Sequence, residues 1–227
     1  MRAQEFATEM AGSVHQGIRN YLQNRGYEYI KSGIDKHVFR EPGTGEIYLV
    51  FGTRPGYENK FTPDQLMFRD WINYCNKNRA NPHLPRFSGL ESFDYRGQRY
   101  LQARMEPLQE VPPKVGYLVG HIEEAVQRFS RSVGRGNYEN AFAQLIRWAE
   151  HTSIEDNQPE LYDIKQAMDL LGGPAATQAL LKTVHQVAMF GKKHGFSVDL
   201  HQGNYMQRDD GTIVVNDPFV VWMGGRG

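Results

Sequence analysis

The spacing of hydrophobic residues changes along the first half of the chain and predicts both helices and strands. Apolar side chains recur every three or four positions over residues 5–24, which predicts an amphipathic helix. Short segments rich in aromatic and β-branched residues follow at 27–30, 37–40 and 46–51, and they predict strands. The turn sequence Glu41-Pro-Gly-Thr-Gly45 joins the last two segments, so we expect three antiparallel strands.

A second helix is predicted to begin after Thr62. Threonine is a good N-cap, Pro63 suits the first helical turn, and Gln65 completes a capping box. Two further strands are expected at residues 87–95 and 98–105, joined by a tight turn that contains glycine. The first half therefore reads as helix, three strands, helix and two strands.

The second half of the chain has a mainly helical pattern. Helices are predicted at residues 114–132, 137–151, 160–171 and 174–194. Two short strands are then expected at 205–207 and 212–215, around the turn Asp209-Asp210-Gly211. We therefore expect a helical region that ends in a β-hairpin.

Composition and charge narrow the class of protein. The 227 residues include 26 basic and 26 acidic side chains, a balance that favours neither nucleic acid nor a membrane surface as a partner. The one cysteine permits no internal disulfide, and no Cys/His cluster has zinc-ligand spacing. The N-terminus does not resemble a secretory signal, and no apolar run approaches the roughly 18 to 20 residues that span a bilayer. We expect a soluble, cytoplasmic protein.

Residues 196–219 carry the most informative chemistry. A polar loop contains Asp199 and Asn204, a hairpin follows, and Asp217 comes after its second strand. Because a hairpin folds the chain back on itself, Asn204 and Asp217 can lie side by side. Carboxylate and amide oxygens are the ligands that Mg²⁺ prefers. Asp199 lies on the same loop, where it suits a base that orients an attacking hydroxyl.

The spacing Asp-x-x-x-x-Asn, followed thirteen residues later by Asp217, resembles the catalytic-loop and metal-binding pattern of the protein-kinase-like superfamily. The stretch Asp199-Leu-His-Gln-Gly-Asn204 is similar to aminoglycoside and choline phosphotransferases and to small protein kinases of tailed phages. The resemblance covers residues 27–219 in layout, and residues 196–219 by sequence.

This resemblance implies an α+β, two-lobed protein-kinase-like fold, with a small antiparallel N-lobe sheet and a mainly helical, truncated C-lobe. It divides the chain into an N-terminal helix at 1–26, an N-lobe at 27–106 and a C-lobe at 107–227. The C-lobe would hold the catalytic loop and the metal-binding hairpin.

The resemblance also assigns roles residue by residue. Asp199 matches the catalytic aspartate, and Asn204 and Asp217 match the two metal ligands. ATP and Mg²⁺ are the cofactors that it implies. The residues expected to contact the nucleotide are Gly33, Lys36, Val38, Met105 and Glu106.

The chain departs from the family pattern at several positions. Leu49 occupies the place of the lysine that binds the α- and β-phosphates, and Ser197 that of the catalytic-loop histidine. Lys36 is the candidate replacement, because strand alternation puts it on the same face as Val38. The alternative is a solvated lysine at the strand edge. Pro218-Phe219 replaces Phe-Gly after the metal-binding acid.

Other polar residues have more than one interpretation. His201 either hydrogen-bonds its own loop as a structural residue or binds a phosphate. No glutamate stands where the usual partner of the family's lysine would lie, and Gln65 and Asp70 are the nearest polar residues.

Three functions remain open. The first is ATP- and Mg²⁺-dependent phosphoryl transfer to Ser or Thr of a protein, in a host cytoplasm if the chain is phage-encoded. The second is a catalytically weak pseudokinase that acts as a protein-binding or inhibitory module, which Leu49 and Ser197 favour. The third is a small-molecule phosphotransferase. Because the sequence stops ten residues after Asp217, we expect the acceptor to be held by the helices of 114–194 or by a protein partner.

Overall fold

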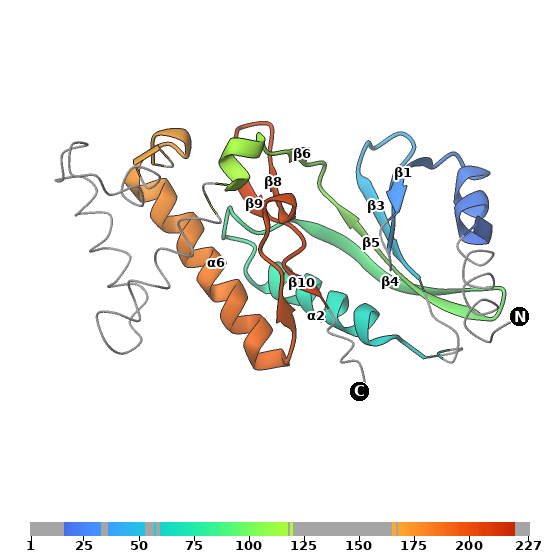
Figure 1. Ribbon diagram of the computed structural model, residues 1–227. Helices are drawn as coiled ribbons and strands as arrows, with labels where there is room; N and C mark the ends of the chain where they lie inside the picture. The colour runs from blue at the N-terminus through green and yellow to red at the C-terminus, as the bar shows by residue number, and fades with distance from the viewer. Residues whose placement is uncertain are drawn as a thin grey trace, which may run out of the picture. The chain divides into compact units, whose positions relative to one another are not determined.

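The protein, seen here in a computed structural model, is α+β, with small antiparallel sheets and helices (Figure 1). The structure describes residues 16–32, 36–52, 57, 60–117, 119, 165–166 and 168–220. The chain divides into two compact units. The first comprises Met1–Arg79 and Pro85–Pro107, and the second comprises Ala80–Leu84 and Leu108–Gly227.

The first unit contains a five-stranded antiparallel sheet. Its strands are β1 (Glu28–Ser32), β2 (Lys36–Arg40), β3 (Ile47–Phe51), β4 (Phe87–Tyr95) and β5 (Gln98–Met105). Their order in the sheet is β1-β2-β3-β5-β4 (Figure 1). The five strands confirm those expected from the sequence, with ends that differ by one or two residues at most.

One face of this sheet is covered by helical residues 16–23. Ile18 and Leu22, four positions apart on the helix, are buried against the sheet. The strand residues that they pack with are Phe39, Tyr48, Val50 and Tyr100. The helix predicted over 5–24 is thus confirmed where the chain is described, and residues 5–15 lie outside the described residues.

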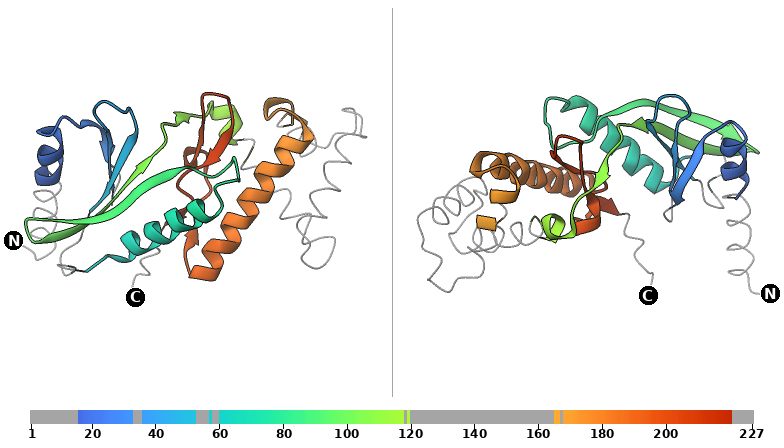
Figure 2. Two further views of the ribbon diagram at one scale, coloured as in Figure 1. Left: turned by 180° about the vertical axis from the view of Figure 1, so that it is seen from behind. Right: turned by 90° about the horizontal axis from the view of Figure 1, so that it is seen from above.

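The opposite face of the sheet is covered by α2 (Pro63–Lys77). The ring of Phe68 on this helix lies 3.8 Å, centroid to centroid, from the ring of Phe51 on β3. Side chains alternate across a strand, so Phe51 and the β2 residue opposite it, Lys36, share this face. Figure 2 shows α2 running along β4 in both of its views. We call this side of the sheet the α2 face.

The start of α2 is fixed by the predicted capping box. Thr62 Oγ1 accepts from the backbone N–H of Gln65, and Gln65 Oε1 accepts from the backbone N–H of Thr62. Gln65 Nε2 also donates to the carbonyls of Phe51 and Arg99, each over 3.1 Å. A fully buried glutamine therefore ties the helix to β3 and β5.

The second unit contains helix α6 and two small sheets. Helix α6 spans Pro174–His194, and the strands are β6 (Gln109–Glu110), β7 (Ser197–Val198), β8 (Tyr205–Gln207), β9 (Ile213–Val215) and β10 (Phe219–Val220). β6, β8 and β9 form one sheet in that order, and β7 pairs with β10. The hairpin expected at the end of the chain is β8–β9, so that prediction is confirmed.

Helix α6 ends as the sequence predicts. Gly195 follows it in the left-handed conformation, with φ of 72°, and Lys192 and Lys193 lie in its last turn. Near this end Gly191 touches the β7–β10 pair, since a Cβ on it would lie 2.6 Å from Cε1 of Phe219. The helix therefore packs against the strand that follows Asp217.

The other predicted helices are only partly within the described residues. Residues 113–117 and 119 are helical, as are 165–166 and 168–170, which fall within or beside the predictions for 114–132 and 160–171. The helix predicted at 137–151 lies outside the described residues. In the described part of the chain, no helix has the length and hydropathy needed to cross a bilayer.

Candidate functional site

The polar loop of residues 199–204 is closed by its own hydrogen bonds. Asn204 Nδ2 donates to the carbonyl oxygen of Asp199 over 2.6 Å. The backbone N–H of Asn204 donates to the carbonyl oxygen of His201 over 2.9 Å. Asn204 is buried, with 8% of its surface exposed. Because Nδ2 is engaged as a donor, Oδ1 is the atom of this amide that can bind a cation.

The β8–β9 hairpin continues by one more hydrogen bond at its open end. Tyr205 pairs with Val215 in the ladder, and beyond this pair the backbone N–H of Asn216 donates to the carbonyl oxygen of Asn204 over 2.9 Å. The hairpin therefore carries the residue before Asp217 back to the end of the polar loop.

Asp217 lies between two residues whose main-chain groups are hydrogen-bonded to the polar loop. On one side Asn216 is bonded to Asn204, and on the other the carbonyl of Pro218 accepts from the backbone N–H of Asp199 over 2.8 Å. The β7–β10 pairing then continues from this point. The main chain thus brings the neighbours of Asp217 against both ends of the polar loop.

The carboxylate of Asp199 is accessible and lies beside a histidine. Its Oδ2 is 3.6 Å from Nε2 of His201, and 43% of the Asp199 side chain is exposed. Nδ1 of His201 accepts from the backbone N–H of Gly203 over 3.0 Å, so in the neutral ring the proton is on Nε2, facing Asp199. A Cβ on Gly203 would lie 2.8 Å from this ring, which explains the glycine. The bond to Gly203 agrees with the structural interpretation of His201.

The oxygen donors at this loop are of the kind and number that Mg²⁺ binds in proteins. In the described ranges no three His, Cys, Asp or Glu side chains gather as a metal cluster. Mg²⁺ usually takes one or two protein oxygens and completes its shell with water and phosphate oxygens. Asn204 Oδ1 and the Asp217 carboxylate provide oxygens of that kind.

The nucleotide residues expected in the first unit share the α2 face of its sheet. Val38 pairs with Leu49, Lys36 lies two residues before Val38, and Met105 pairs with Ile47 at the end of the sheet. The Lys36 ammonium is 5.5 Å from the ring centroid of Phe68 on α2. Lys36 is thus half-buried, with its ammonium near an aromatic ring of α2.

Leu49 itself is a core residue of the first unit. Only 3% of its surface is exposed, and it lies between Val38 and Ala103 in the sheet. A charged side chain at this buried position would need an ion partner. The structure therefore accounts for a leucine here as packing.

Glu106 and Gly33 are the other two residues expected to contact the nucleotide. Glu106 donates its backbone N–H to the carbonyl of Arg86 over 3.1 Å, and its Oε1 accepts from the backbone N–H of Arg86 over 2.9 Å. Gly33 lies outside the described residues.

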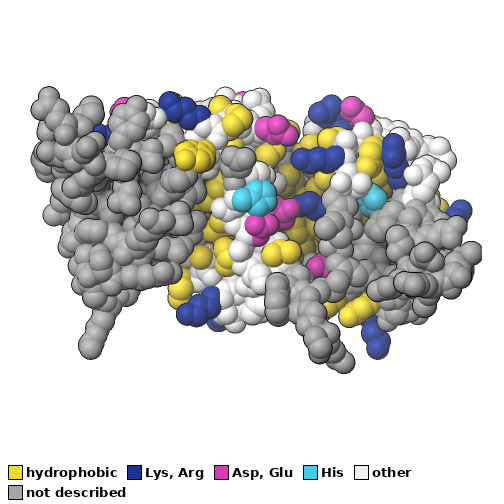
Figure 3. Space-filling view, in the orientation of Figure 1, with side chains coloured by type: hydrophobic (Ala, Val, Ile, Leu, Met, Phe, Trp, Pro, Cys, Tyr) yellow, Lys and Arg dark blue, Asp and Glu magenta, His cyan; other side chains and the backbone are white. Residues whose placement is uncertain are grey.

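The polar residues considered as partners for a lysine have other roles. Gln65 is committed to the capping box and to two strand carbonyls. Asp70 forms an ion pair with Arg69 over 3.1 Å. Figure 3 shows both basic and acidic side chains on the part of this face that is coloured.

The contacts between residues 82–84 and the hairpin are not predicted by the sequence. His83 accepts at its carbonyl from the N–H of Val215, and the side chain of Arg208 donates to the carbonyls of Pro82 and Leu84. In the sequence, Asn81-Pro82 signals only the end of a helix. These contacts join residues more than 120 positions apart, so no local pattern marks them.

No protein-family model and no curated protein matches the chain. Among solved structures, the chain is similar to an aminoglycoside phosphotransferase from Alicyclobacillus acidocaldarius, with a TM-score of 0.34 and 12% identity. This match covers 84% of the chain and 61% of that protein, so the chain spans less than two thirds of its length. It is also similar to the choline kinase LicA from Streptococcus pneumoniae, with a TM-score of 0.30, 11% identity, and coverage of 92% and 68%.

Proposed function

We propose that the protein transfers a phosphoryl group from Mg-ATP to a hydroxyl acceptor. The observation that carries this proposal is the position of Asp217, whose two neighbours are hydrogen-bonded to Asn204 and Asp199. Such an arrangement gathers a carboxylate, an amide oxygen and an accessible acid in one region of the second unit. These are the groups that phosphoryl transfer requires for metal binding and for orienting a hydroxyl.

The three residues have separate roles in this reaction. Asp199 accepts a hydrogen bond from the acceptor hydroxyl and takes its proton as the oxygen bonds to the γ-phosphorus. The bond from the γ-phosphorus to the bridging oxygen breaks, and ADP leaves with that oxygen. Asn204 Oδ1 and the Asp217 carboxylate would hold Mg²⁺, which when bound neutralises the charge of the phosphates.

The nucleotide contacts belong to the α2 face of the first unit. Val38 and Met105 are the apolar residues of this face that we assign to the base, and Lys36 is the cation that we assign to the phosphates. We include Gly33 and Glu106 in the nucleotide site. The support for Lys36 is its place on the α2 face, with its ammonium beside α2.

The central test is magnesium-dependent ATP binding by the whole chain, measured by calorimetry. We expect Mg²⁺ to raise the ATP affinity of the wild type, and Asp217→Asn to remove this increase. Asp209→Asn is the matched control, because Asp209 lies on the exposed hairpin turn and should leave the increase intact. A wild type that binds ATP equally with and without Mg²⁺ contradicts the proposal.

The acceptor is a serine or threonine of a protein, or the hydroxyl of a small molecule. The two similar solved structures are named for small-molecule substrates, an aminoglycoside and choline. Labelled ATP added to a bacterial lysate separates the two cases. Label in protein bands supports the protein acceptor, and label in small soluble compounds supports the other.

A second candidate function is a pseudokinase that acts as a protein-binding or inhibitory module. The buried Leu49 favours it, because this position provides no cation for the phosphates. Such a module would transfer no label to any acceptor, and Asp199→Ala would be as inert as the wild type.

A further inference from the structure

Ala80–Leu84 belongs to the second unit, although it lies between α2 and β4 of the first unit in sequence. The segment runs along the edge of β9 that faces away from β8. The backbone N–H of Val215 donates to the carbonyl of His83 over 2.9 Å, and Nδ1 of His83 lies 2.8 Å from the carbonyl oxygen of Ile213. Because that oxygen can only accept, Nδ1 is the protonated ring nitrogen. β9 is therefore held on both edges.

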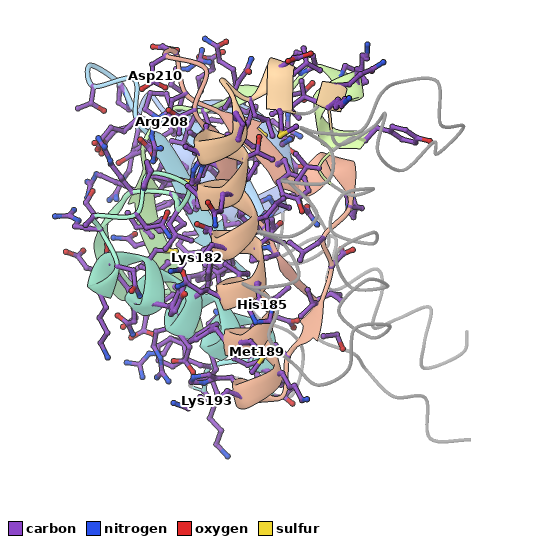
Figure 4. All side chains as sticks on the ribbon, turned by 90° about the vertical axis from the view of Figure 1, so that its left-hand side faces the viewer. Lys182, His185, Met189, Lys193, Arg208 and Asp210 are labelled. Atoms are coloured by element: carbon purple, nitrogen blue, oxygen red, sulfur yellow. The ribbon has the colours of Figure 1, made fainter. Side chains whose placement is uncertain are left out.

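Arg208, directly after β8, provides a second attachment. Its guanidinium donates to the carbonyl of Leu84 over 2.9 Å and also to that of Pro82, on either side of His83. Its backbone N–H closes the hairpin turn by donating to the carbonyl of Thr212 over 3.0 Å. Figure 4 shows Arg208 close to Asp210 at the turn end of the hairpin. One side chain thus joins the turn to the segment.

The third attachment is to α6. Asn81 Nδ2 donates to Thr183 Oγ1 over 2.9 Å, while Asn81 Oδ1 accepts from the backbone N–H of His83 over 2.9 Å. Thr183, His83 and Leu84 are all buried. Burial also lowers the pKa of His83, so its imidazole is neutral at pH 7 and does not repel the nearby Arg208.

We propose that Ala80–Leu84 is a positioning brace for Asp217, which acts through His83 and Arg208. By holding β9 in place, the brace keeps Asn216 opposite Asn204 and thereby sets the magnesium affinity of the site. The magnesium part of this inference rests on the proposed function. His83 and Arg208 are positioning residues, because they touch β9 and its turn rather than the reacting groups.

The physical reason is the shortness of the hairpin. β8 and β9 share only three residue pairs, and a two-stranded hairpin is marginally stable by itself. Opening of the ladder at its end would move Asn216 away from Asn204 and carry Asp217 with it. The bonds from His83 and Arg208 attach β9 and the turn to a buried segment, which opposes that opening.

The test compares variants of the whole chain by amide hydrogen exchange and by the Mg²⁺ concentration that half-saturates ATP binding. Arg208→Gln and His83→Leu should each speed exchange of the Asn216 amide about tenfold and raise the half-saturating Mg²⁺ concentration about tenfold. His83→Asn keeps a donor near the position of Nδ1 and should restore most of both values. Lys193→Gln, on the exposed face of α6 seen in Figure 4, should change neither value.

Faster exchange at Val215 with wild-type exchange at Asn216 and wild-type Mg²⁺ dependence would overturn the inference. If the wild type shows no Mg²⁺-dependent ATP binding, the proposed function fails, and the Asn216 amide still decides whether the brace acts. If His83→Leu does not fold, Arg208→Gln and His83→Asn are compared with the wild type by the same two measurements. Wild-type exchange at Asn216 and wild-type Mg²⁺ dependence in Arg208→Gln would then overturn the inference.

Discussion

Asn216 donates its backbone N–H to the carbonyl oxygen of Asn204 over 2.9 Å, one step beyond the last pair of the β8–β9 ladder. The hydrogen bond fixes the residue before Asp217 to the residue that ends the polar loop. Asn204 in turn donates its side-chain amide to the carbonyl of Asp199. The three residues proposed for catalysis and metal binding are therefore linked by two hydrogen bonds, one between main-chain groups and one from the Asn204 side chain.

Replacing Asp199 separates binding from turnover. In Asp199→Asn the amide cannot take the proton of the acceptor, so we expect kcat to fall by about 10²- to 10⁴-fold. The affinity for Mg-ATP should stay within about twofold of the wild type, because this carboxylate is assigned to the acceptor. Single-turnover kinetics and calorimetry on the same preparation measure both quantities. Asp210→Asn, on the hairpin turn, is the control, and an equal loss of ATP affinity and kcat in Asp199→Asn would argue against the assigned role.

Replacing Lys36 tests the cation on the α2 face. Lys36→Ala should weaken ATP binding about tenfold, since a charge-assisted hydrogen bond is worth about 1.5 kcal/mol or more. Arg40→Ala is the control on the same strand, because Arg40 is paired with Glu28 over 2.9 Å on the exposed edge of the sheet. Calorimetric titration with ATP gives the comparison. An unchanged affinity in Lys36→Ala would show that Lys36 does not bind the phosphates.

The close approach of Gly191 to Phe219 predicts that an alanine at position 191 destabilises the protein, whereas alanine usually stabilises a helix. Alanine in place of glycine within a helix ordinarily stabilises by about 1 kcal/mol. At Gly191 the added methyl would lie 2.6 Å from Phe219, so we expect Gly191→Ala to lower the free energy of unfolding by about 1 to 3 kcal/mol. Urea unfolding measures the change, with Gln186→Ala on the exposed side of α6 as the control. A more stable Gly191→Ala would mean that α6 and β10 are not in close contact.

Burial of His83 predicts a loss of stability in acid. Burial is the main cause that lowers the pKa of His83 below its ordinary 6.5, the carbonyl of Ile213 opposes the shift, and Arg208 adds to it. Because the pKa is lower in the folded chain than in the unfolded one, protonation favours unfolding. The stabilisation is complete above about pH 6.5 and is lost as the pH falls through the pKa of the folded state.

We therefore expect the free energy of unfolding to decrease as the pH falls below about 6.5, and to decrease less in His83→Asn, which cannot titrate there. Urea unfolding at several pH values measures both slopes. Parallel slopes for the wild type and His83→Asn would show that His83 titrates alike in the folded and unfolded chains.

Much of the first unit could be predicted from the sequence because its signals are local. The capping box of Thr62 and Gln65 fixes the start of α2, and glycine-containing turns separate strands of clear composition. The further bonds of Gln65 to the carbonyls of Phe51 and Arg99 could not be predicted, because they depend on how the helix meets the sheet. Strands of two residues, such as β7 and β10, have no period to detect.

The polar loop and its hairpin could be anticipated because both lie within one short stretch of sequence. The turn at Asp209-Asp210-Gly211 predicts a hairpin, and a hairpin brings Asn204 and Asn216 to its open end. The role of His83 could not be anticipated in the same way. Its partner Ile213 is 130 residues away, and the intervening chain gives no sign of the pairing.

The separation between His83 and Ile213 has a consequence for the growing chain. During synthesis Ala80–Leu84 leaves the ribosome long before the residues of β9, so the second unit cannot close until β9 has been made. A fragment that begins at Leu108 would also lack this segment and would present an uncovered strand edge to other chains. The second unit is therefore assembled from two separate stretches of the chain, and excision at Leu108 would not yield it whole.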